Sequence, residues 1–267
     1  MSAFVHETAE IAPGVILGPG AVIGAHARIG AHTQLDPYAV VGPYTTLGEN
    51  NHVFSFAVVG GPAQDRRTAA DAPHTLVCGS DNIFREGVTI SRGTEHGGGV
   101  TRIGDHNLFM AHSHVGHDAR FGSQNTIANG VSIGGHVSVG DHATIGGHAA
   151  IHQFVRIGSL AFVAANAMVS RDIPPYCMAA GDRAKLLGLN ITGLKRAGFT
   201  AEIRGALNEA FGLLLRAGKE PRAQRAEAEL KHPLTQVVEM ATFILASERG
   251  VAAASRRGTN TPDGPIH

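Results

Sequence analysis

The chain has 267 residues, enough for one large domain or two smaller ones, and its 22 basic and 22 acidic residues cancel. No apolar run approaches the roughly 18 residues of a membrane span, the N-terminus lacks the basic-then-apolar order of a signal peptide, and two cysteines make no disulfide framework. We therefore expect a cytoplasmic protein with no membrane span, and its 35 glycines against 14 aromatic residues argue against an ordinary globular core.

A six-residue repeat begins at Val5 and organises two thirds of the chain. Steps of six from Val5 reach Val59, and further runs from Cys78 and from Ile103 bring the total to 25 hexads, 24 of them led by a large apolar residue. The fifth residue of each hexad in the first run is small or compact. Helices repeat every 3 to 4 residues and strands every 2, so a period of six fits only short strands joined by regular corners.

Three hexads make one triangular coil, with the lead residues stacked inside and successive coils paired as parallel strands about 4.8 Å apart. The repeat therefore predicts a parallel β-helix of about 8 coils. Small fifth residues, and glycines such as Gly24 after the lead residue, are expected to let the backbone turn tightly.

The repeat slips out of phase twice. Val59 and Cys78 are 19 residues apart, and Ile90 and Ile103 are 13 apart, each one more than a multiple of six. The segments 60–77 and 91–102 must leave the triangular prism of stacked coils as loops. Insertions in repeat proteins often gather on a functional face.

Beyond Ile173 the repeat ends at Pro174–Pro175 and a helical pattern follows from Leu194. Thr200 is a candidate N-cap and Gly218 a candidate C-terminal stop, with further helices expected over 220–231 and 234–248. We assign 1–187 to the β-helix, 188–250 to a small α-helical domain and 251–267 to a disordered tail.

Residues 1–182 carry a net charge of −5 and residues 183–231 one of +5, an asymmetry that indicates a partner surface on the basic part.

Most of the 16 histidines have a simple explanation. Seven occupy the fourth, outward-facing corner position of a hexad, where a polar side chain is solvated: His26, His32, His106, His112, His136, His142 and His148. His114, His117 and His152 fall elsewhere, and Asp118 could fix the tautomer of His117 and raise its basicity. From the pattern alone these are either solvated residues, a catalytic base, or part of a zinc triad completed by a third histidine across a subunit interface, as in hexapeptide-repeat carbonic anhydrases.

Five strings occur in order and carry a more specific resemblance: HVGHD (114–118), GGHVSVGD (134–141), IHQFVRIG (151–158), RDIPPY (171–176) and GLNITGLKRAGF (188–199). Together with the helical C-terminus they resemble the UDP-N-acetylglucosamine O-acyltransferases that begin lipid A synthesis in Gram-negative bacteria. The resemblance implies a left-handed parallel β-helix, a homotrimer with sites between prisms, no cofactor, no bound metal and no nucleic-acid partner. The implied reaction moves a 3-hydroxyacyl group from acyl carrier protein to the glucosamine 3-hydroxyl of UDP-N-acetylglucosamine.

The resemblance also implies roles for individual residues. His117 would be the general base, Asp118 its orienting partner, and the Gly135 backbone N–H the donor to the oxyanion. The residues implied in substrate binding are Gln64, Asp65, Arg67, His114, His136, His152, Gln153, Asn190 and Arg196. The 60–77 loop would come from the subunit next to the one that supplies His117, and Ala165 matches a position that sets acyl-chain length.

Three points stay open in the sequence. Arg67 stands where better-known members have lysine, and Ala197 replaces a second basic residue after Arg196, so the roles of both positions are in question. The preferred acceptor could carry a 3-amino group in place of the 3-hydroxyl. Because Ala165 is larger than the glycine that leaves the acyl groove open, we expect a somewhat shorter acyl chain, and the basic helical segment should steer the acidic carrier protein.

Overall fold

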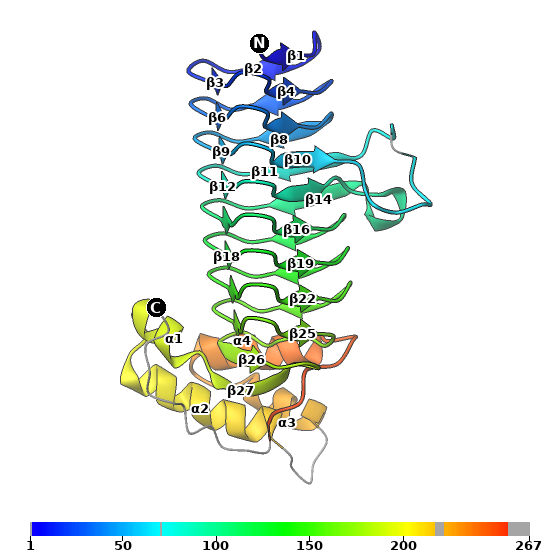
Figure 1. Cartoon of the computed structure of the whole chain (residues 1–267). Helices are drawn as coiled ribbons and strands as arrows, with labels where there is room; N and C mark the ends of the chain where they lie inside the picture. The colour runs from blue at the N-terminus through cyan, green and yellow to red at the C-terminus, as the bar shows by residue number, and fades with distance from the viewer. Residues whose placement is uncertain (1, 70, 217–221, 256–267) are drawn as a thin grey trace.

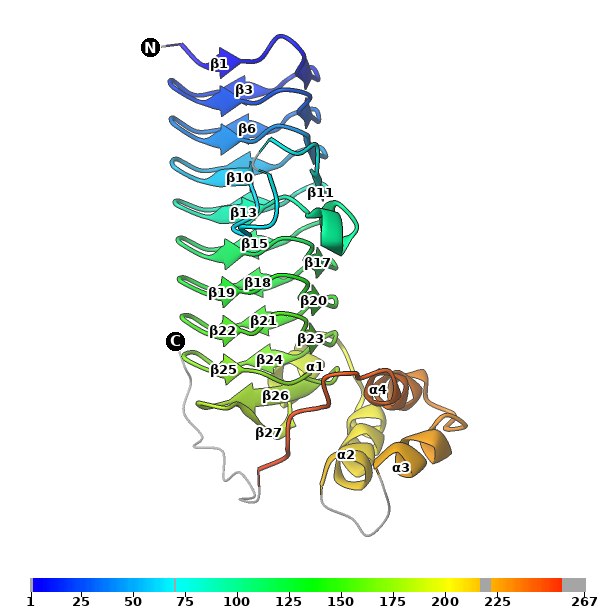
Figure 2. The same ribbon diagram turned by 90° about the vertical axis from the view of Figure 1, so that its right-hand side faces the viewer.

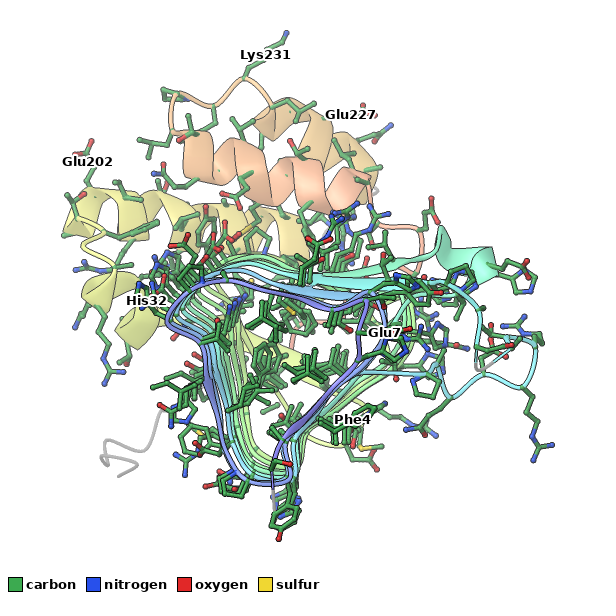
Figure 3. All side chains as sticks on the ribbon, turned by 90° about the horizontal axis from the view of Figure 1, so that it is seen from above. Phe4, Glu7, His32, Glu202, Glu227 and Lys231 are labelled. Carbon is green, nitrogen blue, oxygen red and sulfur yellow. The ribbon has the colours of Figure 1, made fainter. Side chains whose placement is uncertain are left out.

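The computed structural model describes all residues except 1, 70, 217–221 and 256–267. Three sheets wrap around one long axis, and seen along that axis the backbone outlines a triangle filled by stacked side chains (Figure 3). The coils follow one another from the N-terminus down to a group of helices at the other end (Figures 1 and 2). The expected parallel β-helix is therefore present.

Each sheet takes every third strand, so neighbours in a sheet are one coil apart. The first sheet has nine strands: β1 (Phe4–Val5), β4 (Val22–Ile23), β7 (Val40–Val41), β10 (Val58–Gly61), β13 (Thr89–Ser91), β16 (His114–Val115), β19 (Ser132–Ile133), β22 (Ala150–Ile151) and β25 (Met168–Val169). The second sheet has eight: β2 (Glu10–Ile11), β5 (Arg28–Ile29), β8 (Thr45–Leu47), β11 (Thr75–Cys78), β14 (Val100–Ile103), β17 (Arg120–Phe121), β20 (Ser138–Val139) and β23 (Arg156–Ile157). The third has ten: β3 (Ile16–Leu17), β6 (Gln34–Leu35), β9 (His52–Val53), β12 (Ile83–Phe84), β15 (Leu108–Phe109), β18 (Thr126–Ile127), β21 (Thr144–Ile145), β24 (Phe162–Val163), β26 (Cys177–Ala180) and β27 (Lys185–Leu189).

The lead residues form the core, as the hexads predict. From Ile23 to Val169 they are buried, and the pairing register joins lead residue to lead residue, as in Val115 with Ile133. Val5, Ile11 and Leu17 are the exceptions, the first two 40% and 37% exposed and Leu17 partly exposed. They belong to the first coil, which has no described coil above it to cover them.

The corners are made differently from the expectation. The fourth hexad residue, not the glycine after the lead residue, adopts the left-handed conformation, with φ near 56° at His26. Gly24 itself has no positive φ; a Cβ there would lie 2.6 Å from the backbone nitrogen of Pro43 in the next coil. Glycine at this position therefore permits close approach of two coils, and the turn is made two residues later.

Both out-of-phase segments leave the prism at one corner. One joins β10 to β11 and the other joins β13 to β14, so each runs from the first sheet to the second. They project together on one side of the molecule, and the second contains the 3₁₀ helix η1 (Glu95–Gly97) (Figure 1). The prediction of loops at these two places is confirmed.

The prism continues past Pro174–Pro175, where the sequence placed its end. Ile173 bridges to Ile157 in parallel and β26 pairs in parallel with β24. The strand β27 then turns back antiparallel on β26 and closes the end. The hexad period is lost here because paired positions of successive coils are two residues closer in sequence, as Ile157 and Ile173 are, than in the coils before. The coil is still completed.

Four helices follow: α1 (Ile191–Arg196), α2 (Ala201–Leu215), α3 (Arg222–Glu229) and α4 (Thr235–Leu245). Thr200 is the N-cap of α2 as predicted, its side chain accepting from the Ile203 N–H at 3.3 Å. Gly218 lies outside the described residues. Helix α4 lies outside the second sheet (Figure 3). The Phe243 ring of this helix packs under the Arg156 guanidinium of β23.

Part of the expected disordered tail is folded. Val251 and Ala252 are buried, and Val251 and Ala254 bridge to Asp172 and Leu186. The expectation of disorder was wrong for 251–255, because small apolar residues there cover the end of the prism, while 256–267 lie outside the described residues. Among the described helices, none is both long and apolar enough to cross a membrane.

Candidate active site

Three equivalent turns stack below the two inserted loops, at the corner between the first and second sheets. They comprise residues 116–118, 134–136 and 152–154, each set 18 residues and one coil after the previous one. The parallel register therefore places His117 above Gly135 and Asp118 above His136. This corner brings together most of the residues that the sequence singled out.

His117 and Asp118 form a directly bonded pair. The Nδ1 of His117 lies 2.8 Å from Oδ2 of Asp118, whose side chain is 1% exposed, whereas the His117 side chain is 15% exposed. An ionised carboxylate only accepts hydrogen bonds, so this contact fixes the proton on Nδ1 and leaves the Nε2 lone pair of His117 free to take a proton.

The second out-of-phase segment, residues 91–102 (the second insert, as 60–77 is the first), holds the Asp118 carboxylate. The backbone N–H of Thr94 donates to Oδ1 at 2.9 Å, and the Thr94 hydroxyl donates to Oδ2 at 2.6 Å. Burial alone would raise the pKa of Asp118, but the hydrogen bonds from Thr94 and His117 outweigh burial and leave the pKa below its usual value. Thr94 was missed in the sequence; the phase slip marked its loop, but nothing marked this residue.

Gly135 lies directly against the His117 ring. A Cβ built on Gly135 would come within 2.7 Å of Cε1 and 2.8 Å of Nε2 of His117. Within the described residues, the Gly135 N–H donates to no protein acceptor. Gly135 is buried and lines the same pocket as His117, and a backbone N–H without a protein partner can in general donate to a developing negative charge.

His136 combines a corner role with a place in the site. Its φ is 60°, as at the other corner histidines, and its ring stacks on Phe154 at 4.3 Å and meets His117 edge-on at 5.1 Å. Burial lowers the pKa of His136, and the nearby Asp118 carboxylate opposes this only in part. The expectation of a merely solvated corner is wrong for this one histidine, because Asp118 occupies the equivalent position one coil above.

A pocket of about 530 Å³ runs from this corner along the first sheet. Its walls include His117, Gly135, His152 and Gln153 at the corner, and small side chains of β19 and β22 beyond them. His114 lines it from β16; its Nδ1 lies 2.8 Å from the Thr89 hydroxyl, and burial lowers its pKa. The far end is lined by residues that the sequence did not single out: Met168, Val169, Ser170 and Arg183.

The first insert reaches the same pocket from the same chain. Gln64 lines the pocket together with His117, so the expectation that a neighbouring subunit supplies this loop is wrong. The loop leaves the first sheet two strands above β16 and folds over the corner beside it. The Arg67 side chain donates three hydrogen bonds to Asp65, from Nη2 to Oδ2 at 2.7 Å and from Nε to Oδ1 at 3.1 Å and to Oδ2 at 3.2 Å, and these bonds lower the pKa of Asp65.

Three predicted residues lie away from this pocket within one chain. Asn190 caps α1 by accepting from the Gly193 N–H at 3.0 Å and donates to the Leu160 carbonyl at 2.9 Å, at the corner between the second and third sheets. Arg196 is exposed at the end of α1. Ala165 is exposed at the third corner, between β24 and β25.

Comparison with known proteins decides the family. The chain is 46% identical over 208 residues to the acyl-(acyl-carrier-protein)–UDP-N-acetylglucosamine O-acyltransferase of Anaeromyxobacter sp. (strain Fw109-5), covering 77% of this chain and 80% of that one. The chain belongs to this O-acyltransferase family. The corresponding protein of Alkalilimnicola ehrlichii is 42% identical over 73% of this chain and 76% of its own. The family model for UDP N-acetylglucosamine O-acyltransferase, domain 2, matches residues 172–252.

Solved structures of O-acyltransferases agree in fold. UDP-N-acetylglucosamine acyltransferase of Francisella novicida superposes with a TM-score of 0.91 at 34% identity, covering 95% of this chain and 93% of that one. The enzyme of Moraxella catarrhalis gives 0.90 at 34% identity, over 94% and 98%. The left-handed parallel β-helix with a small helical C-terminal part is therefore confirmed.

The alternative of a metal triad requires a third histidine from a neighbouring subunit, and it stays a prediction. His117, Asp118 and His136 do have ligand atoms within 4.8 Å of one another. However, Asp118 Oδ2 already accepts from Thr94 and His117, and His114 Nδ1 is engaged by Thr89. These contacts occupy atoms that a metal ion would need as ligands.

Proposed function

We propose that the protein transfers a 3-hydroxyacyl group from acyl carrier protein to the glucosamine 3-hydroxyl of UDP-N-acetylglucosamine, the first step of lipid A biosynthesis. The observation that carries the proposal is the His117–Asp118 pair beside a pocket that is also lined by Gly135, directly next to the His117 ring. Relatives at 42–46% identity named for this reaction support it.

In the proposed mechanism His117 is the general base. A sugar hydroxyl is a weak nucleophile at neutral pH, so a base must remove its proton as oxygen attacks the thioester carbonyl. Nε2 takes the proton while Nδ1 stays bonded to Asp118, whose negative charge stabilises the imidazolium. The tetrahedral intermediate then expels the thiolate, and Nε2 returns the proton to sulfur, so no acyl-enzyme forms.

Gly135 and the groove supply the remaining parts. The Gly135 N–H is the proposed donor to the oxyanion, and its lack of a side chain leaves room for the reacting carbonyl. Beyond it, the pocket passes from β16 to β25, three coils or about 14 Å at strand spacing. Ser132 and Ala150 line this stretch and are small enough to admit an acyl chain.

The proposal includes a homotrimer in the cytoplasm. Asn190 and Arg196 match nucleotide-binding positions yet lie at a different corner from His117. A neighbouring prism packed at the pocket corner would bring such residues to it, with Arg196 suited to a diphosphate. The basic segment 183–231 would attract the acidic carrier protein.

The test is a thiol-release assay with purified protein, UDP-N-acetylglucosamine and 3-hydroxyacyl carrier proteins of several lengths. Wild type should release thiol only when the sugar nucleotide is present, and His117→Ala should be slower by about 100-fold to 10,000-fold. His96→Ala is the matched control, because His96 is an exposed histidine of the second insert that does not line the pocket. Equal rates for the His117 variant and wild type would overturn the assignment of the base.

Two alternatives have their own outcomes in the same assay. Activity lost to a chelator and restored by zinc would favour the metalloenzyme. Transfer to a 3-amino UDP-sugar but not to UDP-N-acetylglucosamine would redefine the acceptor, because an amine needs less help from a base.

A further inference from the structure

Thr94 is the residue of the second insert that contacts the catalytic pair most closely. It is fully buried, and it gives both of its donors to Asp118, the N–H to Oδ1 and the hydroxyl to Oδ2. The hydroxyl therefore shares Oδ2 with Nδ1 of His117. With both oxygens held, the carboxylate plane is fixed relative to the imidazole.

The rest of the second insert is shaped to keep this contact. Gly97, at the end of η1, packs so closely on Asp118 that a Cβ there would overlap the carboxylate. On the other side of the loop, the Thr101 hydroxyl accepts from the Asp118 backbone N–H at 2.8 Å. Asp118 has φ of 59°, the same left-handed conformation as the other corner residues, so its backbone is ordinary and these contacts are what distinguish its side chain.

Two imidazoles compete for the same carboxylate oxygen. Oδ2 lies 2.8 Å from Nδ1 of His117 and 3.9 Å from Nε2 of His136 in the coil below. Rotation of the carboxyl group would exchange one partner for the other, and the Thr94 hydroxyl on Oδ2 opposes that rotation. Other titratable groups near this set are His114 on β16 and Asp65 and Arg67 of the first insert, and among the described residues none of the three is bonded to Asp118.

We infer that Thr94 is a positioning residue, which directs Asp118 towards His117 and away from His136 and so selects which histidine acts as the base. This inference rests on the proposed function. It also gives the second insert a role, because the insert stands in the place of the corner above Asp118 and brings Thr94 to its carboxylate.

The test compares three substitutions of Thr94. Thr94→Val removes the hydroxyl and keeps the shape, Thr94→Ser keeps the hydroxyl, and Thr94→Ala removes it without placing a methyl group against the carboxylate. Thr126→Val is the control, because Thr126 has the same chemistry on β18 of the third sheet, on the far side of the prism. Melting temperatures identify any variant that does not fold, and Thr94→Ala replaces Thr94→Val if that variant fails.

In the thiol-release assay, Thr94→Val should lower kcat by about 10-fold to 100-fold, the range for losing a hydrogen bond to a charged group. KM for UDP-N-acetylglucosamine should change by less than twofold, and Thr94→Ser should restore most of kcat. Wild-type kcat in a folded Thr94→Val or Thr94→Ala variant would overturn the inference, as would equal losses in the valine and serine variants.

A second readout does not depend on turnover. Diethyl pyrocarbonate acylates neutral imidazoles, and peptide mass spectrometry gives the rates at His117 and His136 separately. The ratio of the His117 rate to the His136 rate should fall in Thr94→Val and return in Thr94→Ser; an unchanged ratio would overturn the inference. If wild type transfers no acyl group to any acceptor, the proposed function fails, while this ratio still decides whether Thr94 positions the pair.

Discussion

The substitution Gly135→Ala tests the geometry of the site with one methyl group. The new Cβ would lie 2.7 Å from Cε1 of His117, whereas ordinary contacts begin at 3.4 Å, so the ring must move by about 0.7 Å. Such a shift stretches the 2.8 Å bond to Asp118 and moves Nε2 away from the sugar hydroxyl. Because a displacement of about 1 Å can cost 100-fold in rate, we expect kcat to fall by roughly 30-fold to 100-fold.

The assay is thiol release at saturating substrates, with thermal unfolding measured in parallel. Gly135 has no positive φ, so alanine is conformationally acceptable, and overpacking should cost about 1–3 kcal/mol of unfolding free energy, leaving the fold intact. Gly147→Ala is the matched control: Gly147 has the same place in its hexad, but its nearest neighbour to a new Cβ is at 3.4 Å. Wild-type kcat in a folded Gly135→Ala variant would refute the assignment of His117 as a base held at this position.

Further predictions concern acid stability, coil contact and acyl length. Asp118 has a lowered pKa, so its carboxylate stabilises the fold above its unfolded-state pKa of about 3.9 and this stabilisation is lost as pH falls through the folded-state value; urea midpoints of Asp118→Asn should therefore fall less than those of wild type below about pH 4. Gly24→Ala should lower the unfolding free energy by about 1–3 kcal/mol because of its contact with Pro43, whereas Gly188→Ala, with open space around it, should change it little; chemical denaturation measures both. If Ala165 shortens the groove, turnover across acyl lengths should favour chains shorter than those used by a glycine-bearing relative, and a clear preference for the longest chain would contradict this.

The regular part of the molecule could be read from the sequence because one physical rule repeats throughout it. A lead residue such as Ile133 must be apolar since it stacks inside between its counterparts one coil above and below, Val115 and Ile151. The same argument applies at every hexad, so the strands, their parallel pairing and the phase slips all follow from spacing.

The left-handed backbone conformation of the corner residues explains the abundance of histidine more fully than solvation does. Seven histidines at fourth hexad positions all have φ between 55° and 60°: His26, His32, His106, His112, His136, His142 and His148. Histidine, asparagine and aspartate are enriched in this left-handed conformation, and Asn50, Asp81 and Asp118 occupy the same kind of position. Most of these histidines therefore serve the backbone, while His117, without a positive φ, does not.

The irregular parts could not be predicted from spacing. Thr94 meets Asp118 because its loop folds back on the corner. No periodicity in the sequence specifies the path of that loop. The same is true of Gln64, whose loop was expected from a neighbouring subunit. The buried Val251 belongs to a segment whose composition is that of a tail, and its burial depends on the end of the prism being present.

The β-helix also explains why a base and an oxyanion donor can lie so close together. In parallel coils the equivalent residues of consecutive turns are separated by one strand spacing, about 4.8 Å, so a side chain at 117 lies over the backbone of residue 135. Glycine at 135 leaves that space open, so the ring of His117 can lie directly against the backbone below it. The proposed base and oxyanion donor thus need only the correct residues at equivalent positions of two turns, whereas the orientation of Asp118 depends on a contact from outside the regular coils. The second insert provides this contact through Thr94, which is why the departure from the repeat lies directly above the site.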